Sequence, residues 1–114
     1  MIAINILGTD YFIHVGDFPE IDNYDGVTVF DTKNIYISGN IANEYFLNAT
    51  LRHEIIHAFL FESGLHSCSN DIKCWALNEE IIDFFALQYE KINKTIESCR
   101  EQVINEWSEL NAWI

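Results

Sequence analysis

Two histidines and a glutamate in the middle of the chain have the types and spacing that metal binding requires. The segment from 51 to 64 reads LRHEIIHAFLFESG, with His53 and His57 four positions apart and Glu54 directly after the first histidine. On a helix, positions i and i+4 share a face, so both imidazoles can present a nitrogen to one ion. Glu54 lies about 100° around the helix from His53. Its carboxylate can therefore hold a water molecule on that ion.

The residues around this motif predict a helix that is mostly buried. Asn48 or Thr50 can cap its N-terminus, and Gly64 stands where a left-handed residue commonly ends a helix. Imidazoles and a carboxylate on a buried helix are costly unless they are paired or bind an ion. This cost favours a metal over two hydrogen-bonded core histidines, and the His-Glu-x-x-His spacing is the one found in zinc peptidases.

Length and composition predict one globular domain covering residues 1–114. The chain is 49% hydrophobic and 14% aromatic, which is enough for a packed core. No apolar run reaches the roughly 18 residues of a membrane span, and the N-terminus lacks the features of a signal peptide. We therefore expect no membrane association.

The charge and the cysteine content limit which classes of partner and which cellular compartment we expect. Eighteen acidic residues against six basic ones give a net charge of −12, which would repel a phosphate backbone, so direct nucleic-acid binding is not expected. The three cysteines, Cys68, Cys74 and Cys99, are an odd number, which favours reduced thiols and a cytoplasmic protein. Cys68 and Cys74 match no common zinc spacing.

The first forty residues predict two β-hairpins. Alternating apolar residues at 2–6 and 11–15 indicate the first, with a turn at residues 8–10. The stretches 27–30 and 35–38 indicate the second. His14 is interpreted as an exposed strand residue without a role, and residues 17–26 as a loop.

A long helix is predicted from Trp75 or Asn78 toward the C-terminus. Apolar residues recur at spacings of three, four and seven in one stripe: Phe85, Tyr89, Ile92, Ile96, Cys99, Val103 and Leu110. Strands followed by helices predict an α+β fold. Because the stripe is long, the helix either folds back on the domain or pairs with a second chain, which predicts a monomer or a weak dimer.

A third metal ligand is expected at the start of that long helix. Catalytic zinc takes three protein ligands and leaves one position for water. Glu79 follows His57 by 22 residues (79 − 57), and Asp83 lies four beyond it on the same helical face. Glu79 can bind the ion while Asp83 accepts a hydrogen bond from a ligand histidine. Glu80 competes for the ligand role, whereas Glu62 lies about 180° around the helix from His53.

His53-Glu54-x-x-His57 followed by Asn78-Glu79-x-x-x-Asp83 resembles the gluzincin signature of zinc peptidases. The stretch from Glu79 to Ala86 resembles the small ImmA/IrrE-type metallopeptidases of phages and mobile elements. The resemblance implies a minimal zincin core, in which a small antiparallel or mixed sheet packs on an active-site helix and a glutamate-bearing helix. It also implies a zinc cofactor and hydrolysis of a peptide bond in a protein, which in several members is a repressor.

The parts of this site predict a mechanism. Zinc lowers the pKa of its bound water toward about 7, and Glu54 takes the proton as general base. The strand Ile35–Ser38 is expected to be the edge that aligns an extended substrate, so Ile35, Tyr36 and Ile37 are candidate substrate-binding residues. Tyr36, Tyr45 and His66 are candidates for oxyanion stabilisation, and the sequence does not choose among them.

Two other functions stay open at this point. A small acidic domain with a metal can be a non-catalytic binding module, such as an inhibitor or a sequestering partner. A zincin fold can also keep its metal and lose its activity. Glu54 favours the enzyme, because a closed structural site has no use for a general base.

Overall fold

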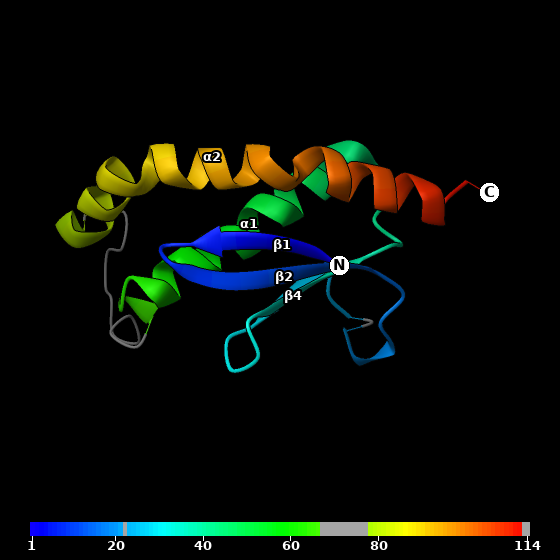
Figure 1. Ribbon diagram of the computed structural model, residues 1–114, viewed down its shortest axis with the longest axis horizontal. Helices are drawn as coiled ribbons and strands as arrows, with labels where there is room; N and C mark the ends of the chain where they lie inside the picture. Colours follow the sequence, from blue (N-terminus) through cyan, green and yellow to red (C-terminus); the bar gives the residue numbers. More distant parts are fainter. Residues whose placement is uncertain (22, 67–77, 113–114) are drawn as a thin grey trace.

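The computed structural model describes residues 1–21, 23–66 and 78–112, which form a four-stranded sheet covered on one face by two long helices (Figure 1). The strands are β1 (Ile2–Ile6), β2 (Thr9–Gly16), β3 (Gly26–Val29) and β4 (Asn34–Ser38), with a short 3-10 helix η1 (Pro19–Ile21) between β2 and β3. The helices are α1 (Glu44–Glu62) and α2 (Glu79–Leu110). The α+β class and both hairpins are confirmed. Neither helix is both long and apolar enough to cross a bilayer.

The first hairpin turns at Leu7 and Gly8, one residue earlier than the predicted turn at residues 8–10, because Thr9 and Asp10 belong to β2. Leu7 and Gly8 have φ angles of +51° and +94°, as a two-residue turn of the mirror-image type requires. The amide of Gly8 donates to Asn5 Oδ1 at 3.0 Å. The turn places β1 antiparallel to β2, with Ile4 opposite Tyr11. This register sends the alternating apolar residues of both strands to the same face.

The second hairpin joins the first through a parallel pairing. The strand order is β1-β2-β4-β3, with β2 parallel to β4 and β3 antiparallel to β4. The sheet is therefore mixed. The expectation that Ile35–Ser38 forms an edge is wrong, because β4 lies between β2 and β3. The edges of the described sheet are β1 and β3.

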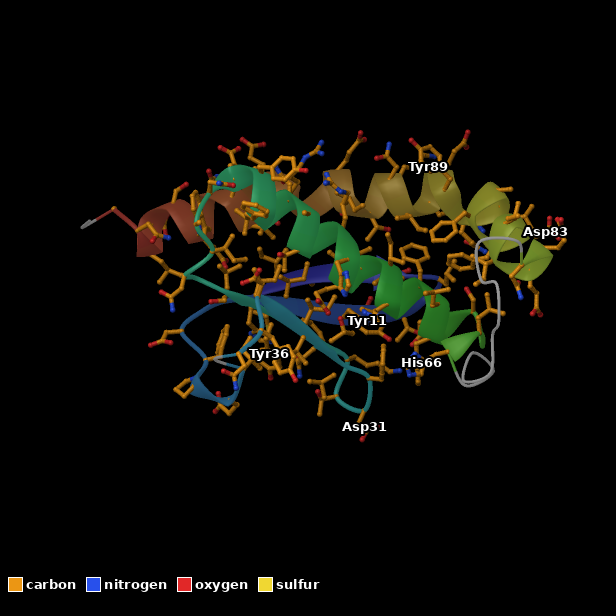
Figure 2. All side chains as sticks on the ribbon, turned by 180° about the vertical axis from the view of Figure 1, so that it is seen from behind. Tyr11, Asp31, Tyr36, His66, Asp83 and Tyr89 are labelled. Atoms are coloured by element: carbon orange, nitrogen blue, oxygen red, sulfur yellow. The ribbon has the colours of Figure 1, made fainter. Side chains whose placement is uncertain are left out.

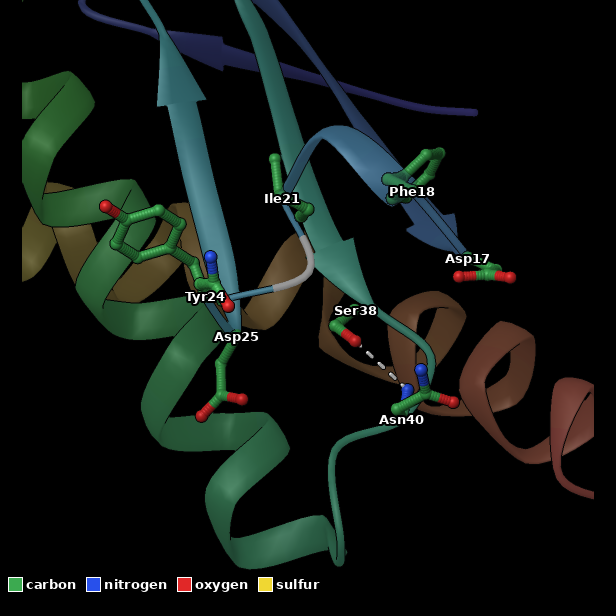
Figure 3. A pocket seen from close by; sticks show the side chains of 8 residues that line it. Asp17, Phe18, Ile21, Tyr24, Asp25, Ser38 and Asn40 are labelled. Carbon is green, nitrogen blue, oxygen red and sulfur yellow. Dashed lines mark hydrogen bonds between the residues drawn. The ribbon is translucent and has the colours of Figure 1, made fainter.

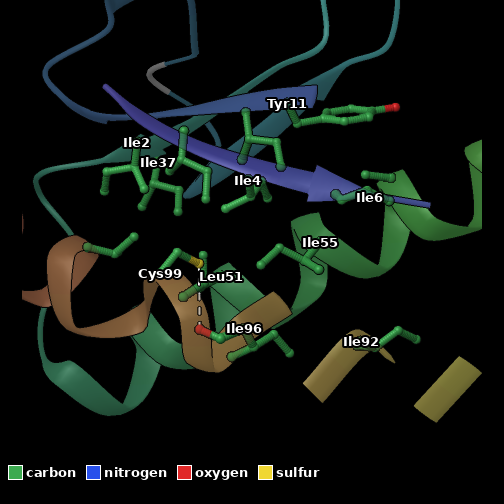
Figure 4. Packing of buried hydrophobic residues seen from close by; sticks show 14 of the residues in the cluster. Ile2, Ile4, Ile6, Tyr11, Ile37, Leu51, Ile55, Ile92, Ile96 and Cys99 are labelled. Carbon is green, nitrogen blue, oxygen red and sulfur yellow. Dashed lines mark hydrogen bonds between the residues drawn. The ribbon is translucent and has the colours of Figure 1, made fainter. Parts of the chain in front are cut away.

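One hydrophobic core fills the space between the sheet and the helices (Figure 4). The inward faces of the strands meet the apolar stripe of each helix. The residues that are fully or almost fully buried include Ile6, Tyr11, Ile13, Ile35, Ile37, Leu51, Ile55, Phe59, Ile96, Cys99 and Val103. Each large aliphatic side chain in such a core contributes about 1.5–3 kcal/mol by leaving water. The core holds α1 against the sheet and thereby positions the motif.

Helix α1 begins earlier than the sequence suggests. Its N-cap is Asn43, whose Oδ1 accepts a hydrogen bond from the Phe46 amide at 3.0 Å. Asn48 and Thr50, the predicted caps, lie inside the helix, because the apolar stripe already starts at buried Leu47. At the other end, Gly64 has a φ of +78°, so the predicted left-handed C-terminal residue is confirmed.

Helix α2 folds back along the sheet rather than projecting from it. Asn78 caps it by accepting from the Ile81 amide at 3.0 Å, and Ile92, Ile96, Cys99 and Val103 are buried against the strands and α1. Near the C-terminus, Trp107 Nε1 donates to the carbonyl of Ile41 at 3.1 Å. The stripe is not buried throughout. Tyr89 and Leu110, two of its predicted members, are 67% and 49% exposed.

Candidate metal centre

The two motif histidines converge on α1. Their Nε2 atoms lie 3.0 Å apart, and their rings meet edge to face with centroids 4.6 Å apart. Two imidazole nitrogens that share a tetrahedral zinc at about 2.0–2.1 Å lie about 3.3 Å from each other. The observed separation is close to that value. The His53 and His57 side chains therefore fit a shared zinc ion without a change of helix geometry.

Glu54 is the one buried charged residue among those the structure describes, with 5% of its surface exposed. The Thr28 hydroxyl on β3 donates to Glu54 Oε1 at 2.8 Å and approaches the Glu54 carbonyl at 3.2 Å. Glu54 Oε2 lies 4.0 Å from His53 Nε2. One carboxylate oxygen is thus fixed by β3, while the other lies beside the histidine pair.

Gly26 lets β3 approach α1 at this point. A Cβ atom at Gly26 would lie 2.9 Å from Thr50 Cγ2, 3.0 Å from Glu54 Cγ and 3.2 Å from Glu54 Oε2. These distances are too short for a side chain to fit without movement. The glycine therefore allows the Thr28–Glu54 hydrogen bond to form.

The environment of His57 favours its neutral form. Burial lowers the pKa of His57, the Glu54 carboxylate opposes this shift, and the charges of His53 and His66 lower the pKa further. The net direction is downward from the ordinary value of 6.5. A neutral imidazole is the form that binds a metal ion.

The predicted third ligand is not brought to the histidines. Glu79 is exposed in the first turn of α2. Asp83, which Figure 2 labels, is exposed one turn later. In residues 1–21, 23–66 and 78–112, no group of three or more histidine, cysteine or acidic side chains has the arrangement of a metal site. No hydrogen bond joins Asp83 to His53 or His57 in these ranges. Cys68 and Cys74 lie outside the described residues.

Glu62 is excluded as a ligand by its own contacts, as its position on the helix predicts. It accepts from Thr9 at 2.8 Å, from Tyr11 at 2.7 Å and from Lys33 at 3.0 Å. Lys33 Nζ also lies 4.6 Å from the centroid of the Phe61 ring. This cluster ties the end of α1 to both hairpins. These contacts position α1 and lie on the side of the helix away from the histidines.

The proposed oxyanion candidates occupy different environments. Tyr36 stacks on His14 with ring centroids 5.0 Å apart, and His14 Nε2 lies 2.8 Å from Asn34 Oδ1. His14 is therefore partly buried and partnered, in contrast to its interpretation as an exposed residue. Tyr45 is 72% exposed in the first turn of α1. His66 is well separated from Tyr36 in Figure 2 and is the candidate whose charge acts on His57.

The candidate substrate-binding residues of β4 also need correction. Ile35 and Ile37 are fully buried in the core, so neither can contact a substrate. Tyr36 points to the opposite face of the sheet, where it meets Phe18 and His14.

The strand beside the motif is β3, which supplies Thr28. No pattern in the sequence distinguished Thr28 from other strand residues, whereas the glycine at the start of a strand was a weak signal of close approach.

Comparisons with known proteins give this chain no relative: no family model, no curated protein and no solved structure matches it.

Proposed function

We propose that the chain is a zinc-dependent metallopeptidase with a minimal zincin core, acting on a peptide bond of a specific protein in the cytoplasm. The observation that carries this proposal is the convergence of His53 Nε2 and His57 Nε2 at 3.0 Å, beside a buried glutamate. A buried carboxylate is costly unless it is hydrogen-bonded, paired with an opposite charge or close to a bound ion. Glu54 has one hydrogen-bond donor, Thr28, on one oxygen.

His53 and His57 are the residues that would hold the zinc ion, and we assign the third ligand to Glu79. Zinc, when bound, supplies a water molecule of lowered pKa and polarises the substrate carbonyl. The assignment of Glu79 rests on the resemblance to gluzincins. It requires the start of α2 to come closer to the histidines than the described geometry has it. Glu80 provides a matched control on the same turn.

Glu54 acts as the general base and then as the general acid. Thr28 fixes Oε1 by donating a hydrogen bond at 2.8 Å, which leaves Oε2 to accept the proton of the attacking water. The same oxygen then delivers this proton to the leaving amine, so the carboxylate returns to its starting state.

An extended substrate would align on β3. This strand is an edge of the described sheet and lies directly beside Glu54 through Thr28. Addition of a peptide to such an edge satisfies backbone donors and acceptors that are otherwise unpaired. This replaces the earlier assignment to β4. A repressor-like protein is the partner that the resemblance implies.

The proposal is tested with the full chain and its Glu54→Gln variant. Glutamine keeps the shape and accepts the Thr28 hydrogen bond but cannot take the proton. We expect one zinc per chain in both proteins and a loss of activity of at least about 10²–10⁴-fold in the variant. Candidate substrates are proteins encoded beside the gene. Equal cleavage of one of them by both proteins would refute the mechanism.

Metal analysis tests the ligands separately. We expect His53→Ala and His57→Ala to lose zinc, and Glu79→Ala to bind it more weakly than Glu80→Ala in chelator competition. By analogy with other carboxylates that orient ligand histidines, Asp83→Ala should weaken zinc binding by roughly 10–100-fold. Full zinc occupancy in His57→Ala would refute the metal site.

A non-catalytic binding module is the second candidate. The exposed position of Glu79, away from the histidine pair, favours it, because a catalytic zinc needs three protein ligands. A partner that is bound tightly by the wild type and by Glu54→Gln, and cut by neither, would support this function over hydrolysis.

A further inference from the structure

A cavity opens beside Glu54, between the start of β3 and the first half of α1. Its volume is about 370 Å³, and its walls include Tyr24, Asp25, Phe46, Thr50, His53 and Glu54. Tyr24 and Phe46 are 66% and 51% exposed, so neither residue belongs to the core. The cavity therefore lies where a substrate side chain next to the scissile bond would lie if β3 aligns the backbone.

The walls combine aromatic rings with negative charge. Tyr24 and Asp25 lie beside α1 in Figure 3, which shows a neighbouring pocket that they line together with Asp17. Asp17 is not part of the lining of the cavity beside Glu54. Asp25 and Glu54 are the carboxylates of the cavity, and its described lining contains no lysine or arginine. The chain as a whole carries a net charge of −12. The protein side chains consequently give the cavity a negative potential.

We propose that this cavity is a specificity subsite for a lysine or arginine side chain of the substrate. Aromatic faces accept the aliphatic stem and attract the cation, and the Asp25 carboxylate can pair with the charged end. The inference rests on the proposed function for the neighbouring scissile bond. It goes beyond that function by naming the substrate class and the residues that select it.

Other side chains are less compatible with these walls. An acidic side chain would meet two carboxylates in a protein of strong negative charge. A purely apolar side chain would cover the rings, but it would also remove the Asp25 carboxylate from water without a partner. Gly26 lies close against α1 at the edge of the cavity, since a Cβ there would lie 2.9 Å from Thr50 Cγ2.

Binding is measured first, so that the test does not depend on activity. The full chain, labelled with ¹⁵N, is titrated with N-acetyl-lysine amide and, separately, with N-acetyl-norleucine amide and N-acetyl-glutamate amide. We expect the lysine probe to shift the amide signals of Gly26, Thr50 and their neighbours, with an affinity that falls as salt is added. The other two probes should bind at least severalfold more weakly.

Charge substitutions then test the assignment to Asp25. Asp25→Asn should weaken the lysine probe about two- to fivefold, as expected for a partly exposed ion pair, and Asp25→Lys should remove binding. Asp17→Asn is the matched control, because it neutralises an exposed aspartate nearby that does not line the cavity, and it should bind like the wild type. Equal affinity for lysine and norleucine, or an unchanged affinity in Asp25→Asn, would overturn the proposal.

Cleavage separates this inference from the proposed function. A peptide library incubated with the zinc-loaded wild type should be cut next to lysine or arginine, and Asp25→Lys should lose this preference. Cuts next to apolar or acidic residues alone would overturn the subsite. Binding of lysine that depends on Asp25, with no peptide cut by the wild type, would support the subsite and count against the peptidase.

Discussion

Replacing Glu62 by glutamine should loosen the end of α1 and destabilise the fold. Three side chains donate to this carboxylate: Thr9 at 2.8 Å, Tyr11 at 2.7 Å and Lys33 at 3.0 Å. Removing one partner of a buried ion pair costs about 3–5 kcal/mol. The Lys33 side chain is 31% exposed and can turn toward water, which reduces the loss. We therefore expect the free energy of unfolding to fall by about 2–3 kcal/mol. This value lies between the cost of breaking a buried ion pair and the smaller cost of breaking an exposed one.

The pH dependence of that loss identifies its cause. Burial alone would raise the pKa of Glu62, but the hydrogen bonds from Tyr11, Lys33 and Thr9 and the charge of Lys33 hold it below 4.5. A carboxyl with a lower pKa in the folded state stabilises the fold above its unfolded pKa. This stabilisation disappears as the pH falls through the folded pKa. The difference between wild type and Glu62→Gln should thus be complete at pH 7 and shrink below about pH 4.5.

Urea unfolding followed by circular dichroism measures this difference at pH 7 and at steps down to pH 3. At about 4–8 °C per kcal/mol, the melting temperature at pH 7 should fall by about 8–24 °C. Glu101→Gln changes an exposed glutamate on α2 and serves as the control, with no change expected. The reasoning fails if Glu62→Gln is as stable as wild type at pH 7, or if its deficit is the same at every pH.

Four further predictions concern the site and the core. Thr28→Val should lower the free energy of unfolding by about 1.5–3 kcal/mol, because buried Glu54 loses its donor; Thr28→Ser should restore most of it in the same urea experiment. Gly26→Ala should lower the melting temperature, since its Cβ would lie 2.9 Å from a Thr50 methyl, and an unchanged melting curve would mean that β3 can shift. Ile55→Ala should cost about 2–5 kcal/mol because Ile55 is fully buried, whereas a loss below 1 kcal/mol would indicate a collapsed core. Burial raises the pKa of Cys99 to about 11, so alkylation followed by mass spectrometry should leave it unmodified until urea unfolds the chain.

The sequence alone determined the local elements and the histidine pair. Strands were predictable because alternate residues point to one face, as at Ile2, Ile4 and Ile6. The convergence of His53 and His57 was predictable because positions four apart share one side of any helix. Both properties depend on backbone geometry over a few residues and hold whatever the rest of the chain does.

Only the tertiary structure decided what stands next to that pair. The parallel pairing of β2 with β4 puts β3 at the edge, and no local pattern encodes the order in which distant strands join. The Thr28–Glu54 hydrogen bond spans 26 residues, so it depends on the packing of β3 against α1. Glu79 follows His57 at a distance in sequence that suits a third ligand. That distance limits how far apart the two residues can lie, but it does not bring them together. Where α2 lies is decided by the burial of Ile92, Ile96, Cys99 and Val103 against the sheet and α1.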